Sequence, residues 1–396
     1  MLTKKLDILF EFFLYLLAYG ITFSNALVEI SLGFVIFLFI LKMAISRKWL
    51  IRRSWISLLI CVLAGVIVVS FLRSEYHKVS FKGVLRIAKY ALLYFAVVDF
   101  MGGAPERKKR FFWAIVVVSG FTFLNGIFQC VFGFDMLRHY GFEPSDSLKR
   151  IKASFVHPND FAGYIISVLP FSFAFLSAGI KKWQKVVLVI ILLLGFYCLA
   201  RTSSRGAWIG FGVGLSIYLL FYKKRLLLIL PVLVSLFALL SPQGFYRIAS
   251  LFNSGQNTVW ERMELWKGAW SMVKVHPILG FGVNTYSKYF PLYKPETYFN
   301  LSYTHNSYLQ MWTEIGILGL AVFLGIVGII MVRSFRDLRI RVKSGVMGII
   351  LLGALSGYSA FLVQAGLDTN LFSLVLVTQF WMMSAYLTSL GEPFKK

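Results

Sequence analysis

Runs of about 20 apolar residues recur along the whole chain, and they constrain its fold more than any other feature. A run of this length crosses the hydrocarbon core of a bilayer as a helix, because a helix satisfies its backbone hydrogen bonds internally. Of the 396 residues, 58% are hydrophobic and only 15% are charged, unlike a soluble domain. The sequence therefore predicts an all-α polytopic membrane protein.

We expect about twelve transmembrane helices within a single transmembrane domain, residues 1–396. The expected spans are 7–23, 25–43, 54–72, 81–101, 111–134, 153–179, 184–200, 205–222, 225–241, 305–332, 345–364 and 367–390. The first run lacks a small-residue cleavage site, so we interpret it as a retained span rather than a signal peptide. The three cysteines all lie in apolar runs and predict neither a disulfide framework nor a metal site.

The basic residues indicate the orientation of these spans. Both ends of the chain and the loops after every second span hold more than half of the 41 lysines and arginines. By the positive-inside rule, both termini are then cytoplasmic, and the long loop 242–304 faces outward together with His305. Because the orientation of a membrane protein already requires many of these basic residues, the net charge of +24 is not a sign of nucleic-acid binding, and we expect membrane lipids as partners and no nucleic acid. The basic residues on the outward side are not explained by topology and suggest an anionic ligand on that face.

A short basic turn, Arg201-Thr202-Ser203-Ser204-Arg205, separates two of the expected spans on the outward side. Ser203 or Ser204 is suited to cap the helix that follows, whose first N–H groups and positive dipole end would lie beside two guanidinium groups. That arrangement is typical of a phosphate site. The alternative is a positively charged hairpin turn whose serines only cap the helix.

The long outward loop contains a largely apolar stripe at helical spacing, formed by Trp260, Met263, Trp266 or Lys267, and Trp270. The stripe predicts an amphipathic helix that lies in the membrane interface, with Arg262 two residues away from it. The segment 276–284 then predicts a tight turn that contains Gly280 and Gly282. Two glycines without a strand before them do not make a nucleotide loop.

His305 stands where this polar segment ends and the next apolar run begins. If that run is helical from His305 onward, Gly316 and Gly319 fall within about 40° of the His305 direction, and glycines there let another helix approach closely. The alternative is a histidine that only caps the helix.

The polar segments 157–160 and 368–370 stand at the start of two other spans. Each would contact a sugar or cap its helix, and for Asp368 we favour capping. No HExxH motif or carboxylate ladder is present, so we expect no metal and no cofactor.

Taken in this order, these motifs resemble those of the O-antigen ligase and polymerase superfamily of bacterial polysaccharide assembly. Ligases of that family carry His-[Asn/Ser/Gln], nine residues and Gly-x-x-[Gly/Thr/Tyr], which match His305-Asn306, 307–315 and Gly316-Ile317-Leu318-Gly319. The other matching elements are the Ser-Arg-Gly-like turn at 203–206, an arginine with a tryptophan helix at Arg262 and Trp266, a Pro…Gly-x-Gly turn at 277–282, and the pair Pro158-Asn159. The motifs cover residues 150–320, and the number of spans fits over the whole chain.

The resemblance implies a GT-C-like membrane glycosyltransferase that is metal-independent and inverting. It implies a glycan donor carried on undecaprenyl pyrophosphate at the outer face of the bacterial cytoplasmic membrane, with the active site on the periplasmic side. Ligases of the family transfer the glycan to lipid A-core, polymerases transfer it to another lipid-linked repeat unit, and one branch transfers it to protein. The match to the ligase motif favours an O-antigen ligase, with the polymerase as the alternative.

The residues fit this chemistry. A pyrophosphate leaving group develops negative charge, which Arg201, Arg205 and Arg262 would stabilise. A neutral His305 near a helix N-terminus would act as the base for the acceptor hydroxyl. Glycan or acceptor contacts are expected from Asn306, Asn159 and Trp266.

A different class of protein, a transporter for a lipid-linked sugar, remains open. It would show internal repeats and several charged residues near the middle of the membrane, for which only Arg86 and Lys89 are candidates.

Overall fold

The computed structural model describes residues 2–143, 148–177, 180–222, 258–294, 303–341 and 345–391. Every element named within these ranges is a helix, and the only β-type pairing there is an isolated bridge between Phe134 and Gly141. Ten of the described helices are long and apolar enough to cross a membrane. The prediction of an all-α polytopic membrane protein is therefore confirmed.

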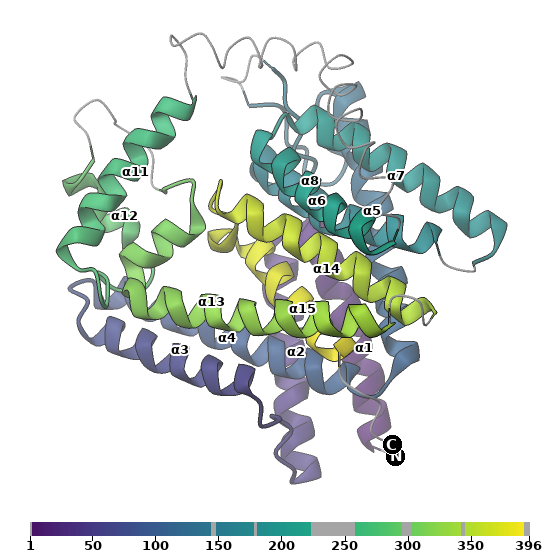
Figure 1. The fold of residues 1–396 in the computed structure, drawn as a ribbon, viewed down its shortest axis with the longest axis horizontal. Coiled ribbons are helices and arrows are strands. Elements are labelled where there is room, and N and C mark those ends of the chain that lie inside the picture. Colours follow the sequence, from purple (N-terminus) through teal and green to yellow (C-terminus); the bar gives the residue numbers. More distant parts are fainter. Residues whose placement is uncertain are drawn as a thin grey trace.

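Figure 1 shows the arrangement of these helices. The α-helices in chain order are α1 (Leu2–Phe23), α2 (Asn25–Ser46), α3 (Trp55–Leu72), α4 (His77–Met101), α5 (Pro105–Phe132), α6 (Pro158–Leu176), α7 (Lys182–Thr202), α8 (Arg205–Tyr222), α11 (Thr258–Val275), α12 (Tyr286–Tyr289), α13 (Ser307–Arg341), α14 (Val346–Ala365) and α15 (Leu374–Gly391). The described residues also contain two short 3-10 helices, η2 (Phe290–Leu292) and η3 (Asn370–Phe372).

Several boundaries differ from the expected ones. Prolines at the first helical position start α5 at Pro105 and α6 at Pro158, because a fixed φ and a missing N–H cost nothing there. The helix α4 forms as expected, but it is too polar to count among the ten apolar spans, since Lys78, Lys82, Arg86 and Lys89 lie in its first two thirds. The expected span 225–241 and residues 242–257 and 295–302 of the long loop lie outside the described residues.

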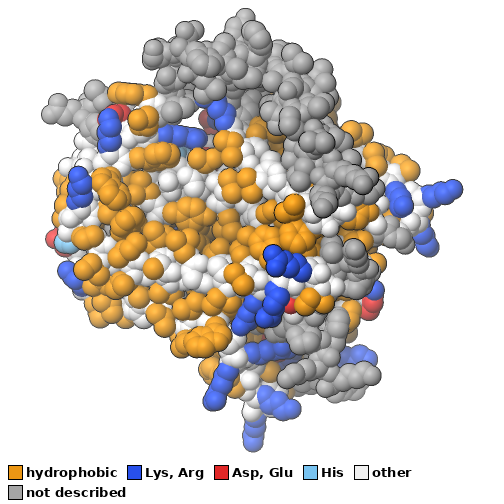
Figure 2. Space-filling model, viewed as in Figure 1, with side chains coloured by type: hydrophobic (Ala, Val, Ile, Leu, Met, Phe, Trp, Pro, Cys, Tyr) orange, Lys and Arg blue, Asp and Glu red, His pale blue; other side chains and the backbone are white. Residues whose placement is uncertain are grey.

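Ion pairs and a charged hydrogen bond connect the helices at one end of the bundle. Asp7 of α1 lies 3.1 Å from Lys42 of α2 and 2.8 Å from Arg107 of α5. Lys108 of α5 donates a hydrogen bond to the carbonyl of Ser389 in α15. Figure 2 shows apolar side chains over much of the described part of one face, with lysines and arginines mainly around its edges, including the lower end. The turns described below lie at the other end.

Glycines allow α14 to pack closely against α6 and α8. A Cβ on Gly357 would collide with the carbonyl oxygen of Ser167 in α6. On the other side, Cβ atoms on Gly210 and Gly214 of α8 would lie 2.5 and 2.6 Å from carbonyl oxygens of α14. Small residues four positions apart let membrane helices approach to backbone contact. This packing fixes the start of α8 against the end of α14.

The helix α13 is kinked at Gly316, whose φ of 67° and ψ of −178° are not helical. The kink frees backbone groups that pair with the segment 277–282 instead. Phe281 N and Gly282 N each donate to α13 carbonyls, at 2.9 Å, and Ile317 N donates to the Pro277 carbonyl at 2.9 Å. The close neighbour at the glycine face is thus this turn, and the expectation of a second helix there was wrong. Gly316 is needed because L side chains rarely adopt such a φ.

Gly316→Ala should destabilise the protein by about 2–4 kcal/mol, from the unfavourable φ and the collision of a new Cβ with the Ile278 carbonyl. Thermal unfolding of the purified chain in detergent measures this as a lower midpoint. The matched control is Gly328→Ala in the same helix, where a Cβ meets nothing within 4 Å and should be neutral or stabilising by up to about 1 kcal/mol. Equal midpoints for the two variants would contradict the docking described here.

Candidate functional site

His305 lies just before α13 and is not part of it. Its φ of 51° is left-handed, and the helix begins at Ser307. The cap of α13 is Asn306, whose Oδ1 accepts hydrogen bonds from the N–H groups of Tyr308 at 3.1 Å and Leu309 at 3.0 Å. The expected helical alignment of His305 with Gly316 is therefore wrong. Because Asn306 performs the capping, the His305 side chain is left for another role.

The His305 ring pairs with a carboxylate. Its Nδ1 lies 3.1 Å from Oδ1 of Asp368, in the turn between α14 and α15. An ionised carboxylate only accepts hydrogen bonds, so Nδ1 carries the proton and Nε2 keeps its lone pair. Asp368 does not cap α15, which begins six residues later, so the expected capping role was wrong.

Asp368 is held from several sides. Oδ1 also accepts from Thr369 N at 2.8 Å, and Oδ2 accepts from Asn159 Nδ2 at 2.6 Å. Its backbone carbonyl accepts from the N–H of Ser307 at 3.1 Å and from the hydroxyl of Ser307 at 2.8 Å. These bonds connect the turn 366–370 to the first residue of α13 and to the start of α6. The relative position of His305 and Asp368 is thus fixed by three separate elements.

The electrostatic surroundings keep Asp368 ionised. Burial by itself would raise the pKa of this carboxyl, but the hydrogen bond and charge of His305, the N–H of Thr369 and the charge of Arg262 outweigh it and lower the pKa below the ordinary 3.8. Because the folded state lowers the pKa of Asp368, the ionised carboxylate stabilises the fold fully at any pH above the ordinary pKa of an aspartate. This stabilisation is lost only when the pH falls through the lowered pKa. The pair therefore persists through the whole neutral range.

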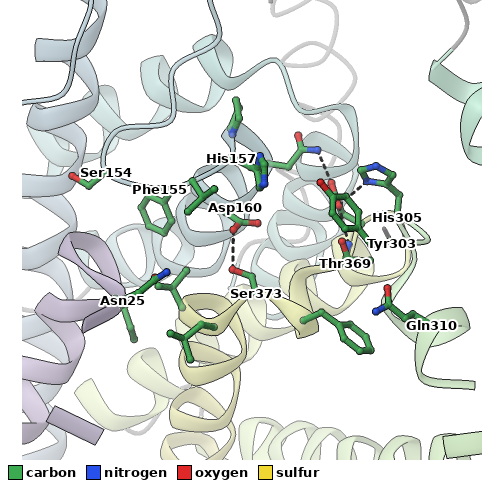
Figure 3. A pocket seen from close by; sticks show the side chains of 18 of the residues that line it. Asn25, Ser154, Phe155, His157, Asp160, Tyr303, His305, Gln310, Thr369 and Ser373 are labelled. Carbon is green, nitrogen blue, oxygen red and sulfur yellow. Dashed lines mark hydrogen bonds and ion pairs between the residues drawn. The ribbon is translucent and has the colours of Figure 1, made fainter. Parts of the chain in front are cut away.

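Beside the pair lies a polar cavity of about 460 Å³. Figure 3 shows Tyr303, His305 and Gln310 on one wall and Phe155, Asp160 and Ser373 across from them. The ring of Tyr303 packs edge-on against His305, with centroids 5.2 Å apart. His305 therefore lines a space whose volume is in the usual range of small-molecule sites.

Two of the expected arginines, Arg205 and Arg262, lie near the His305–Asp368 pair. The turn between α7 and α8 forms as expected, with Ser203 left-handed and α8 starting at Arg205. Gly206 packs on Leu367, next to Asp368, where a Cβ would be 3.2 Å from the Leu367 Cβ. Arg262 of α11 is near enough to interact electrostatically with both Arg205 and Asp368. The structure thus brings Arg205, Arg262 and His305 together from three distant segments.

Arg201 occupies the last turn of α7, and its carbonyl accepts from Ile151 N at 3.3 Å. Its Nε is buried and has no hydrogen-bond partner among the described residues. A buried donor without a partner costs free energy unless a ligand or water satisfies it.

Two of the residues expected to contact glycan are used inside the protein. The indole N–H of Trp266 donates to the Thr304 carbonyl at 3.0 Å and ties α11 to the residue before His305. Asn306 caps α13, as described above, while Asn159 lines the cavity and donates a hydrogen bond to Asp368.

Along α11, the side chains of Trp260, Met263 and Trp270 are exposed, as the interfacial stripe predicts. No group of three or more metal-ligating side chains occurs in the described ranges.

The sequence interpretation missed the role of Asp368. The position of Asp368 in the sequence could have indicated this role. An aspartate at the start of an apolar span is energetically unfavourable unless it has a partner. Its partner lies 63 positions away in sequence, so only the fold shows the contact.

Comparison with known proteins identified a family model that matches part of the chain. A family model described as O-antigen ligase matches residues 190–324, a range that contains the α7–α8 turn, Arg262 and the motif from His305 to Gly319. This part of the chain is therefore similar to the O-antigen ligase family. Together with the ten apolar helices of the described residues, the match indicates a multi-pass protein of the bacterial inner membrane.

Two individual proteins are also similar. An uncharacterised protein of Haemophilus influenzae is 29% identical over 196 residues, which is 43% of this chain and 48% of that protein, so the match spans about half of the relative. A solved structure described as "Structural coordination of polymerization and crosslinking by a peptidoglycan synthase complex" contains a chain with 14% identity and a TM-score of 0.47. The comparison covers 86% of this chain and 97% of that one, and a TM-score of this size does not establish a common fold.

Replacing Asp368 by Asn should lower kcat by about 10²–10⁴, because an amide no longer selects the tautomer with the proton on Nδ1. Affinity for the lipid-pyrophosphate donor that the family resemblance implies should change little, since the arginines remain. Steady-state kinetics with a purified lipid-pyrophosphate donor, together with a separate donor-binding titration, measure the two quantities. A purely structural role for Asp368 would instead lower both kcat and donor affinity, along with the unfolding midpoint.

Proposed function

We propose that the protein transfers a glycan from undecaprenyl pyrophosphate to an acceptor hydroxyl at the outer face of the cytoplasmic membrane. The proposed acceptor is lipid A-core, which makes the protein an O-antigen ligase; a second lipid-linked repeat unit is the alternative and would make it a polymerase. The match to the ligase motif at His305–Gly319 supports the first. The observation that carries the proposal is the His305–Asp368 pair with Arg205 and Arg262 beside it.

The arginines have the proposed role of binding the donor pyrophosphate. When the bond between the anomeric carbon and the phosphate oxygen breaks, the electron pair stays on the phosphate, and negative charge grows there. Arg205 at the start of α8 and Arg262 on α11 supply positive charge, and Arg201 has a buried donor to offer. Guanidinium groups bind two phosphate oxygens at once, so they also orient the leaving group. Charge stabilisation by arginine is why the proposal calls for no metal.

His305 has the proposed role of general base. Nε2 takes the proton of the acceptor hydroxyl while the oxygen attacks the anomeric carbon from the side opposite to the pyrophosphate. This single displacement inverts the configuration at that carbon. The imidazolium that results is stabilised by the carboxylate of Asp368, 3.1 Å from Nδ1. The proton later leaves to water, which restores the neutral ring.

The orientation of the chain belongs to the same proposal. Both termini would be cytoplasmic, with Asp7, Lys42 and Arg107 at that end, while His305 and the arginines would face the periplasm. The GT-C-like character and the undecaprenyl carrier come from the family resemblance and are part of the proposal.

His305→Ala should reduce turnover by about 10²–10⁴, the usual contribution of a positioned base. His305→Gln should not restore it, because an amide can hydrogen-bond the hydroxyl but cannot accept its proton. Transfer is measured with the purified protein, or as glycan display in cells that lack their own enzyme. His77→Ala, at the exposed start of α4, is the matched control and should keep full activity. A fully active His305→Gln variant would show that His305 only orients the acceptor.

Arg205→Ala should abolish most of the transfer and weaken donor binding, and Arg205→Lys should recover little of either, since an ammonium lacks the planar fork of a guanidinium. Donor binding is measured by titration with undecaprenyl pyrophosphate. Arg336→Ala, whose side chain is 72% exposed near the other end of α13, is the matched control. Full activity of the lysine variant would reduce the role of Arg205 to a generic positive charge, and full activity of Arg205→Ala would remove it from the site.

A further inference from the structure

Arg86 is a charged residue in the middle part of α4, a helix that we expect to cross the membrane. It lies nine residues after the start of α4 (His77–Met101), which corresponds to about 14 Å along the helix axis. A guanidinium at such depth is costly and is typically found facing a cavity or a partner rather than lipid. None of the roles described above uses it.

The Arg86 side chain borders two spaces. One is the polar cavity of about 460 Å³ that His305 also lines, and the other is an apolar pocket of about 60 Å³ deeper in the bundle. Its guanidinium carbon lies 5.9 Å from the centre of the Phe372 ring. Arg86 therefore forms part of the inner boundary of the cavity, where the polar lining gives way to apolar side chains.

No carboxylate of the described residues lies within ion-pair distance of Arg86. Glu314 interacts with Arg86 electrostatically, but its hydrogen bonds are made to other groups. Its Oε2 accepts from Asn284 N at 2.6 Å, and Oε1 accepts from Tyr286 N at 3.4 Å and from Gln310 Nε2 at 3.5 Å. Glu314 thus fastens the segment after Gly282 to α13, and its oxygens are occupied by N–H groups.

Other cations nearby do have partners. Lys89, three residues further along α4, pairs with Glu29 of α2 at 2.6 Å. Arg138 donates to the Ser154 carbonyl at 3.2 Å and stacks on the Tyr140 ring. His157 lies 3.6 Å from Glu143. Arg86 differs from these because its N–H donors have no acceptor among the described residues, and because it lines the same cavity as His305.

We propose that Arg86 binds a carboxylate or phosphate of the acceptor glycan, and that the polar cavity is therefore the subsite of an acidic acceptor. The inference rests on the proposed function, which places the donor pyrophosphate at Arg205 and Arg262. Those residues approach Asp368 from α8 and α11, and neither lines the cavity. His305 then stands between the two substrates, with the acceptor on the cavity side.

The experiment uses the full-length chain in detergent and two soluble probes, glucuronic acid and glucose. Binding is measured by titration of the thermal unfolding midpoint. The wild type should bind glucuronic acid about 10- to 100-fold more tightly than glucose, the range expected for a charged hydrogen-bonded pair. Arg86→Gln should lose this preference, and Lys89→Gln, on the same helix, should keep it. A wild type without the preference, or an Arg86→Gln variant that retains it, would overturn the proposal.

Two further variants locate the effect. Arg205→Gln should keep the preference for glucuronic acid, and its loss there would mean that the probe binds at the donor arginines instead. The double variant Arg86→Gln/Glu314→Gln should not regain the preference; recovery would mean that Arg86 only balances the charge of Glu314. Because these measurements need no turnover, they can fail while the transfer reaction stands, and the kinetic tests of His305 and Arg205 can fail independently of them.

Discussion

The hydrogen bond between His305 Nδ1 and Asp368 Oδ1, 3.1 Å long, is the interaction on which the rest of the site depends. It joins the residue that precedes α13 to the turn that precedes α15, and Asn159 and Ser307 hold that turn from two other sides. It also fixes the ring tautomer, so that Nε2 is the atom able to accept a proton. A ring nitrogen able to accept a proton and the carboxylate that orients the ring are thereby placed at the edge of a polar cavity.

Backbone geometry explains how the surrounding segments reach this pair. Glycines of α8 and α14 permit backbone contact, which brings Arg205 next to the turn that contains Asp368. The kink at Gly316 opens α13, and the segment 277–282 bonds to the exposed carbonyls, which anchors α11 beside the histidine loop. The indole of Trp266 adds a bond to the Thr304 carbonyl. The glycines of the sequence motif therefore serve assembly of the site rather than its chemistry.

The sequence alone predicted the fold class, most spans and the α7–α8 turn. These features depend on hydropathy and on proline and serine positions, which can be interpreted without knowing the tertiary contacts. It also singled out the histidine and three arginines. It failed where the outcome depends on tertiary contacts. His305 was placed on the helix because a left-handed residue followed by an Asn cap leaves no periodic signal. Asp368 was interpreted as a cap because its real partner is 63 residues away, and the glycine face was assigned to a second helix instead of a turn.

A double-mutant cycle on His305 and Asp368 tests the central claim, that the two side chains act as one unit in glycan transfer. Turnover of the purified chain with a lipid-pyrophosphate donor would be measured for the wild type, His305→Ala, Asp368→Asn and the double variant. If Asp368 works only through the ring, the double variant should be as slow as His305→Ala alone, with strongly non-additive losses. Losses that multiply would show that the two residues act independently and would contradict the account.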